Sequence, residues 1–172
     1  GLVNSSGQLP DSPADIINLS LGGPDISETL SNAVEQAINQ GIIVIAAAGN
    51  ESTEDNFYPA AYENVIGVSA INEEKQRSSF SNFGDYIDVT APGGTGFGSD
   101  LFDGFQDGIL STLQASTYGE LKGTSMAAPH VAGVAALMKS VNSGIDHTSF
   151  LLALNSGLLT DELPETSLKN FF

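Results

Sequence analysis

The sequence feature that most constrains the fold is an unbroken apolar run at residues 42–47, which reads Ile-Ile-Val-Ile-Ala-Ala. A strand with one face in water alternates apolar and polar side chains, whereas a strand covered on both faces stays apolar along its length. The run therefore predicts an interior strand of a parallel sheet, with other elements packed on both of its faces.

A strand and a helix are expected before this run. Residues 16–21 are a short, largely apolar strand candidate that ends at Gly22-Gly23-Pro24. Asp25 and Glu28 have the spacing of a capping box, which predicts that a helix opens there, and Gly41 lies where a left-handed residue ends a helix. Apolar residues recur between them with helical spacing, at Leu30, Ala33, Val34, Ala37 and Ile38. Two strands joined in this way form a right-handed crossover.

Further elements are expected along the rest of the chain. Residues 65–70 and 86–90 resemble additional strands, the second of them stopped by Pro92. A hairpin, a long helix and a last helix follow at residues 109–113 with 118–121, at 125–140 and at 148–155. The fold class is therefore α/β, with a parallel sheet flanked by helices on both faces.

Charge and composition exclude several classes of function. The chain has 21 acidic and 5 basic residues, a formal net charge of −16, so it has too few cations to neutralise phosphates and no nucleic-acid partner is expected. The longest apolar run, residues 41–49, is far shorter than the roughly 20 residues of a membrane-spanning helix, so no membrane partner is expected. The absence of cysteine excludes disulfides and thiolate chemistry.

The strongest chemical motif is residues 123–137, Gly-Thr-Ser-Met-Ala-Ala-Pro-His-Val-Ala-Gly-Val-Ala-Ala-Leu. A serine in the first turn of a helix, here Ser125, lies near unpaired backbone N–H groups and the positive end of the helix dipole. Such a position suits a nucleophile whose attack creates an oxyanion. Pro129 is expected in the first turn of this helix, where its missing N–H costs nothing.

This stretch resembles the nucleophile motif of the subtilisin-like serine proteases almost residue for residue. The resemblance covers about residues 16–163 and implies that residues 1–172 are the C-terminal portion of a subtilisin-like catalytic domain, truncated at both ends. It implies a serine endopeptidase in which Ser125 is the nucleophile and a protein or peptide is the substrate. It also implies a secreted protein, extracellular or periplasmic.

The second motif is Ala-Ala-Ala-Gly-Asn at residues 46–50, directly after the buried strand. Ligands of parallel sheets bind beyond the carboxyl ends of the strands, where Asn50 and the start of the 125 helix both fall. The side-chain amide of Asn50 can donate a hydrogen bond to a developing negative charge. In the family this asparagine shares the oxyanion with the N–H of the nucleophilic serine, so the resemblance assigns that role to Asn50.

The resemblance also implies a substrate-binding pocket beside this pair. One wall corresponds to Ser20, Leu21 and Gly22, whose strand edge pairs with an extended peptide. The opposite wall corresponds to Ala47, Ala48 and Gly49, with Thr124 next to the nucleophile. Phe57 falls where subtilisins often carry a smaller residue, so we expect a shortened or reshaped pocket.

A base and its orienting carboxylate are missing from the sequence motifs. A serine nucleophile needs a base to take its proton and a carboxylate to orient that base. In this family the aspartate and histidine of the triad precede the asparagine, so they are expected outside this chain, in an N-terminal half that is a partner of this one. His130 is expected to be structural and His147 to lie on the surface. We therefore expect this chain alone to be inactive.

A weaker feature is the acidic segment that contains Asp100, Asp103 and Asp107 near a glycine turn. Carboxylates spaced in this way suit a hard cation such as Ca²⁺. The sequence leaves two interpretations open, a structural calcium site at these aspartates or an acidic loop without metal.

Two functions from different classes are consistent with the sequence. One is an endopeptidase that hydrolyses peptide bonds through an acyl-enzyme. The other is a non-catalytic subtilase-like fragment that only binds peptide or its missing N-terminal half. The presence of both Ser125 and Asn50 favours the first for the whole protein, because a binding domain needs neither.

Overall fold

The computed structural model describes residue 7, residues 12–95 and residues 108–159. A parallel sheet of four strands forms its centre, in the order β1 (Ile16–Leu19), β2 (Ile43–Ala47), β3 (Ile66–Ile71) and β4 (Val89–Pro92). Chain order and spatial order coincide, so β1 and β4 are the two edges of the sheet within the described part of the chain. The apolar run at residue 42 forms β2, which is buried along its whole length between β1 and β3.

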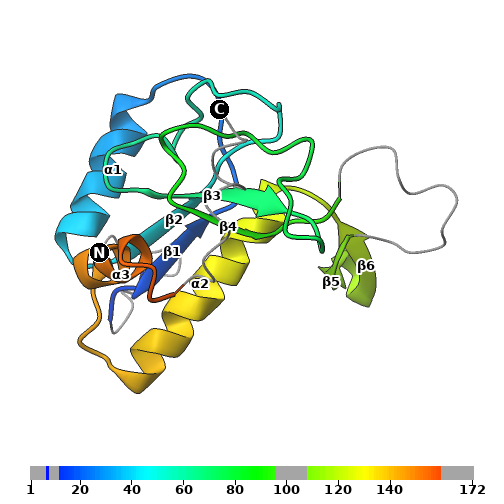
Figure 1. The fold of residues 1–172 in the computed structure, drawn as a ribbon. Coiled ribbons are helices and arrows are strands. Elements are labelled where there is room, and N and C mark those ends of the chain that lie inside the picture. The colour runs from blue at the N-terminus through cyan, green and yellow to red at the C-terminus, as the bar shows by residue number, and fades with distance from the viewer. Residues whose placement is uncertain (1–6, 8–11, 96–107, 160–172) are drawn as a thin grey trace, which may run out of the picture.

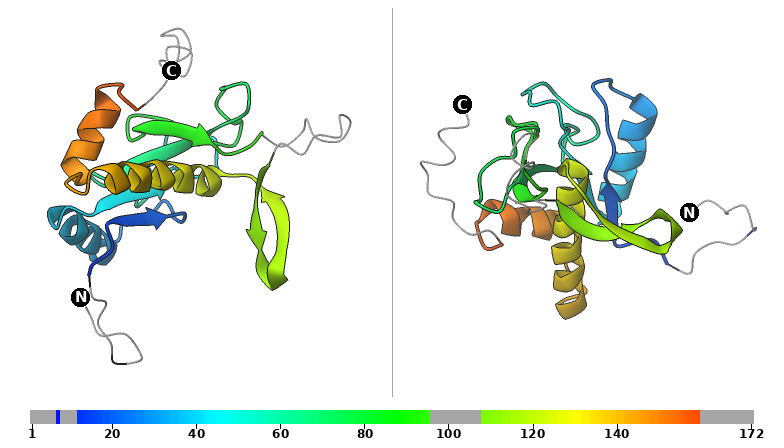
Figure 2. Two further views of the ribbon diagram at one scale, coloured as in Figure 1. Left: turned by 90° about the horizontal axis from the view of Figure 1, so that it is seen from below. Right: turned by 90° about the vertical axis from the view of Figure 1, so that its right-hand side faces the viewer.

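Helices cover both faces of the sheet, as the sequence predicted (Figure 1, Figure 2). Helix α1 (Glu28–Asn39) packs on one face, where Val34 contacts the Val44 and Ala46 side of β2. Helices α2 (Thr124–Val141) and α3 (His147–Asn155) cover the other face. The core on that face is built mainly from aliphatic side chains of β2 and β3 and from small residues of α2, among them Ile43, Ile45, Ile66, Val68, Ala127, Ala128 and Ala135. Small side chains let α2 lie close to the strands.

A two-stranded hairpin precedes α2 and extends away from the sheet (Figure 1, Figure 2). Its antiparallel strands are β5 (Ile109–Leu113) and β6 (Thr117–Leu121), joined by a short turn at Gln114–Ser116. Most of its side chains are exposed, including Leu110 and Tyr118. The hairpin was predicted from sequence.

Four details differ from the sequence-based expectations. Ser27, not Asp25, caps α1, because its Oγ accepts the Leu30 N–H at 3.3 Å. Pro92 is the last residue of β4 rather than a residue beyond it; it pairs with Ile71 at the edge of the sheet, where its missing N–H is tolerated. Pro129 lies in the second turn of α2, because the helix already begins at Thr124. His147 is buried, with 3% of its surface exposed, because α3 packs against β2.

Gly41 follows α1 with φ +80°, the left-handed conformation that was expected there. Within the described ranges, 12–95 and 108–159, no helix is both long and apolar enough to cross a membrane.

Candidate functional site

Three segments that are distant in sequence meet beyond the carboxyl ends of β1 and β2. They are the residues after β1, the residues after β2 and the first turn of α2. Hydrogen bonds join the first to the third between Ser20 and Ser125, and the second to the third between Asn50 and Thr124. Since the strands of the β1–β4 sheet are parallel, their carboxyl ends form one edge, and the N-terminus of α2 points its free N–H groups toward it.

The side-chain oxygen of Asn50 is fixed against the start of α2. Its Oδ1 accepts the Thr124 N–H at 2.8 Å and lies 3.1 Å from the Thr124 hydroxyl. The Thr124 side chain is fully buried, and its Oγ1 also accepts the Gly49 N–H at 3.1 Å. Because the oxygen of Asn50 is engaged, the amide nitrogen is the group of this exposed side chain that is left to donate outward.

Ser125 is the second residue of α2 and is half-buried. Its hydroxyl donates to the Ser20 carbonyl at 3.3 Å, and the Ser20 hydroxyl donates to the Ser125 carbonyl at 2.8 Å. Gly123 precedes the helix with φ +148°, and a Cβ added there would lie 3.5 Å from Asn50 Oδ1. The backbone therefore brings Ser125 and Asn50 to the same end of α2.

Pro129 explains why the Ser125 carbonyl is free to bind Ser20. In an α-helix the carbonyl of residue i accepts the N–H of residue i+4. For Ser125 that residue is Pro129, which has no N–H. The Ser20 hydroxyl occupies the place of the missing donor.

Phe57 lies between the two pocket walls predicted from sequence. A Cβ added to Gly22 would overlap the Phe57 ring, and one added to Gly49 would lie 2.9 Å from Phe57 Cγ. The Phe57 ring thus contacts the backbone of both glycines. Among the other residues of the predicted walls, Ala47 and Ala48 have buried side chains, whereas Leu21 is 56% exposed.

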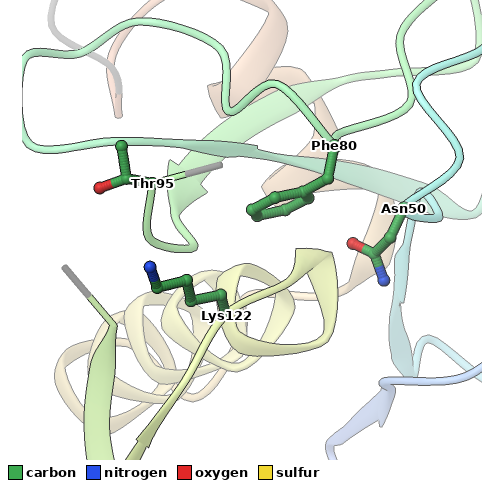
Figure 3. A pocket seen from close by; sticks show the side chains of 4 residues that line it. All are labelled: Asn50, Phe80, Thr95 and Lys122. Atoms are coloured by element: carbon green, nitrogen blue, oxygen red, sulfur yellow. The ribbon is translucent and has the colours of Figure 1, made fainter. Parts of the chain in front are cut away.

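A small cavity of about 150 Å³ lies beside Asn50, lined by Asn50, Phe80, Thr95 and Lys122 (Figure 3). Thr95 Oγ1 is buried there and has no hydrogen-bond partner among the described residues. Sequence reasoning did not find this cavity. Lys122 could have been noted because it directly precedes the Gly-Thr-Ser motif, but nothing in the sequence marks Phe80 or Thr95.

Both histidines of the chain are engaged elsewhere. His130 is exposed on α2, and its Nδ1 lies 2.8 Å from the Met126 carbonyl one turn earlier. The His147 Nδ1 accepts the Val44 N–H at 3.4 Å, and burial lowers the pKa of its imidazole. In the described residues, the Ser125 hydroxyl donates to a backbone carbonyl rather than to an imidazole.

The predicted calcium ligands Asp100, Asp103 and Asp107 lie outside the described residues. Within residues 12–95 and 108–159, no group of three or more Asp, Glu or His side chains is placed to hold a metal ion. The two interpretations of the acidic segment therefore both remain predictions.

A serine at the start of a helix, next to an anchored asparagine amide at the carboxyl edge of a parallel sheet, is an arrangement that suits nucleophilic attack with stabilisation of an oxyanion. The model of the subtilase family matches residues 2–156. The chain therefore belongs to the subtilase family.

Individual relatives agree with this assignment. The chain is 47% identical over 130 residues to a thermophilic serine proteinase of Bacillus sp. (strain AK1), covering 76% of this chain and 29% of that protein. It is 48% identical over 130 residues to subtilisin E of Bacillus subtilis (strain 168), covering 73% and 31%. It is 42% identical over 144 residues to the major intracellular serine protease of the same strain, covering 81% and 41%. The chain thus spans less than half the length of these relatives.

Solved structures show the same fold. A crystal structure of a cold-adapted subtilisin-like serine proteinase matches with a TM-score of 0.73 and 36% identity, covering 85% of this chain and 49% of the other. A protease of Pseudoalteromonas arctica matches with a TM-score of 0.75 and 37% identity, covering 88% and 48%. The subtilisin-like α/β fold predicted from sequence is confirmed.

Proposed function

We propose that this chain is the C-terminal portion of the catalytic domain of a serine endopeptidase. The Ser125 hydroxyl attacks the carbonyl carbon of a peptide bond, and a base takes its proton. The negative charge that forms on the carbonyl oxygen is stabilised by the Asn50 amide and the Ser125 N–H. The C–N bond then breaks, the amine leaves with the proton, and water hydrolyses the acyl-enzyme on Ser125.

The observation that carries this proposal is the anchoring of Asn50 at the first turn of α2. Thr124, the residue before the nucleophile, holds the oxygen of the Asn50 amide through its N–H and its hydroxyl. The nitrogen is then the group left to face a substrate oxygen. Donors that are fixed before the substrate arrives are effective in stabilising an oxyanion, because they need no reorganisation during the reaction.

The aspartate and histidine of the triad are proposed to come from an N-terminal half of the same domain. Both histidines of this chain have other partners, and the chain spans 29% to 41% of the relatives described above. Strand β1 leaves one edge of the sheet without a neighbouring strand in the described residues. Helix α2 exposes apolar side chains that a second half would cover, namely Val134, Leu137 and Val141. An open edge and an apolar helix face both favour docking of further chain.

The substrate is proposed to be a protein or peptide with a small side chain before the cleaved bond. The space between Gly22 and Gly49 is occupied by the ring of Phe57. A pocket shortened in this way accepts alanine better than phenylalanine, because each methylene that fits or clashes changes binding by about 1–3 kcal/mol. Phe57→Gly is expected to reverse this preference.

A structural calcium ion is proposed at Asp100, Asp103 and Asp107. With this ion bound, a chelator is expected to lower the melting temperature of the protein, and replacing these aspartates is expected to remove this response.

We propose an extracellular location, and the relatives described above include one protein named as intracellular. Detection of the native protein in culture medium or in cells distinguishes the two locations.

The test uses the complete catalytic domain, with and without Ser125→Ala. A fluorophosphonate probe is expected to label the unsubstituted protein at Ser125, and the domain is expected to cleave a tetrapeptide p-nitroanilide that ends in alanine. Ser125→Ala should abolish both signals. A folded domain that binds peptide but is neither labelled nor active would instead support the binding-only function.

A further inference from the structure

Asn82 is a fully buried polar residue in the segment between β3 and β4. Its side-chain amide makes four hydrogen bonds to the segment that follows β2. The nitrogen donates to the Ala48 carbonyl and to Glu51 Oε2, both at 3.0 Å. The oxygen accepts the Glu51 N–H at 2.8 Å and the Thr53 N–H at 3.4 Å. One buried amide therefore holds the chain on both sides of Asn50.

Glu51 connects Asn82 to Asn50 directly. The Glu51 Oε2 that accepts from Asn82 also accepts the backbone N–H of Asn50 at 2.7 Å. Hydrogen bonds to a charged acceptor are about twice as strong as those between neutral groups. The backbone of Asn50 is thus fixed from the sheet side by Asn82 and Glu51, while its side chain is fixed from the α2 side by Thr124.

The same two segments also pair through their backbones. The Asn82 N–H donates to the Gly49 carbonyl at 3.1 Å, the Ser52 N–H to the Phe80 carbonyl at 2.9 Å, and the Phe83 N–H to the Thr53 carbonyl at 3.1 Å. Gly49 is closely surrounded, since an added Cβ would overlap Asn82 Nδ2 and lie 2.7 Å from Glu51 Oε2. The segment has little room to move toward Asn82.

We infer that Asn82 is a positioning residue for the oxyanion donor: through Glu51 and the backbone of residues 48–53 it holds the Asn50 amide where the substrate oxygen becomes charged. The inference rests on the proposed function. It follows from the requirement that an oxyanion donor be held in place before the reaction. The side-chain hydrogen bonds of Asn82 go to Ala48, Glu51 and Thr53, so Asn82 acts on Asn50 through other residues.

The inference makes a kinetic prediction that a purely structural role does not. In a subtilisin, loss of the oxyanion asparagine lowers kcat about 10²–10³-fold. Displacement of Asn50 by Asn82→Ala should therefore lower kcat by about 10-fold or more, and KM should stay within about twofold, because the donor acts mainly in the transition state. In an Asn50→Ala background, Asn82→Ala should cause little further loss.

The experiment measures kcat and KM of the complete catalytic domain with a tetrapeptide p-nitroanilide that ends in alanine, for Asn82→Ala, Asn50→Ala and the double variant. Asn82→Asp serves as a second variant of the same size, which keeps both acceptor bonds but loses the amide donors. The matched control is Asn72→Ala. The Asn72 side chain also bonds a carboxylate and a backbone N–H, those of Glu74 and Gln76, but in a turn away from the site.

Each outcome decides the question. Loss of kcat for Asn82→Ala or Asn82→Asp that disappears in the Asn50→Ala background supports the inference. The inference is overturned if the fold losses in kcat of Asn82→Ala and Asn50→Ala multiply in the double variant. It is also overturned if the loss in kcat equals that of Asn72→Ala. Failure of the proposed function is distinguished separately, because then the unsubstituted domain is not labelled by the fluorophosphonate and Ser125→Ala has no effect.

Discussion

The two ends of the candidate site are held in different ways. The Asn50 end is held by buried groups, the Asn82 amide and the Thr124 hydroxyl, each with several partners. The Ser125 end is held by a reciprocal pair with Ser20, a residue that is exposed. The difference shows that the Asn50 side chain is fixed by buried groups of this chain, whereas Ser125 is held only by an exposed residue. In the proposed function, the base would come to that more exposed end from another segment.

The largest effect is expected from Gly49→Ala, a substitution at the buried Asn50 end of the site. Gly49 has φ +103°, and its surroundings leave no space for a Cβ. A non-glycine residue forced into such a conformation costs about 1–3 kcal/mol before the overlap with Asn82 is added. We expect a loss of at least about 2 kcal/mol in the free energy of unfolding, measured by urea denaturation, together with a lower kcat.

Gly23→Ala is the control for this substitution. Nothing lies within 4 Å of a Cβ added to Gly23, and its φ is not in the left-handed range. The change should alter the unfolding free energy by no more than about 0.5 kcal/mol. Equal effects of the two substitutions would show that the buried end is not held as tightly as its contacts indicate.

The next effect in size is that of Thr124→Val, which removes one hydroxyl without changing the shape of the side chain. The buried Gly49 N–H would lose its acceptor and Asn50 Oδ1 one of its two donors. An unpaired buried polar group costs about 1–3 kcal/mol. Thr117→Val, which removes an exposed hydroxyl bound to the Gln114 carbonyl, should cost less. A smaller loss in the free energy of unfolding for Thr124→Val than for Thr117→Val would contradict the view that the Asn50 end is held by buried groups.

A smaller effect is expected from Ser20→Ala at the exposed end. The Ser125 carbonyl would lose its donor, and water can replace it in part. A hydrogen bond contributes about 0.5–1.5 kcal/mol net, so a loss of this size is expected in the free energy of unfolding, measured by urea denaturation. Adding Pro129→Ala returns the N–H that a normal helix would offer, so the double variant should recover part of the loss. No recovery would mean that Ser20 acts in another way.

The smallest effect is a pH dependence of stability from His147, which anchors the far end of β2. Burial lowers the pKa of the His147 imidazole, while Asp146 opposes this shift. The unfolded chain then binds more protons than the folded one as pH falls below about 6.5, so stability decreases in that range. Urea midpoints at pH 7.5 and 5.5 should differ less in His147→Gln than in the unsubstituted protein. An unchanged difference would exclude His147 as its source.

The parts of the fold that could be predicted are those set by local pattern. The apolar run of β2 and the helical spacing of α1 gave the strand–helix–strand unit, and the motif around Ser125 gave α2. The cap of α1 was predicted wrongly because Asp25 and Ser27 both have capping side chains, and only the path of the chain decides between them. His147 was expected on the surface because its burial depends on α3 packing against β2, which the local sequence does not show.

The residues of the candidate site also separate into those that a local motif marks and those that only the assembled fold reveals. Ser125 and Asn50 could be proposed because both stand in short motifs, and the structure places them at the same end of α2. Asn82 was missed because asparagine in a segment between strands is typical of turns, and its four hydrogen bonds are to three residues about 30 positions earlier. The cavity beside Asn50 was missed because its walls, which include Phe80, Thr95 and Lys122, come from separate loops. Contacts between loops are a property of the assembled fold, so single segments do not reveal them.

The proline in the second turn of α2 has a mechanical consequence. The Ser125 carbonyl accepts a hydrogen bond from the Ser20 hydroxyl instead of from a backbone N–H of its own helix. The first turn of α2 is therefore bonded to the residue that follows the edge strand β1. A force that shifts the end of β1 is transmitted through that bond to the peptide group of Ser125. An extended peptide bound along this edge would therefore exert force on the helix turn that carries Ser125.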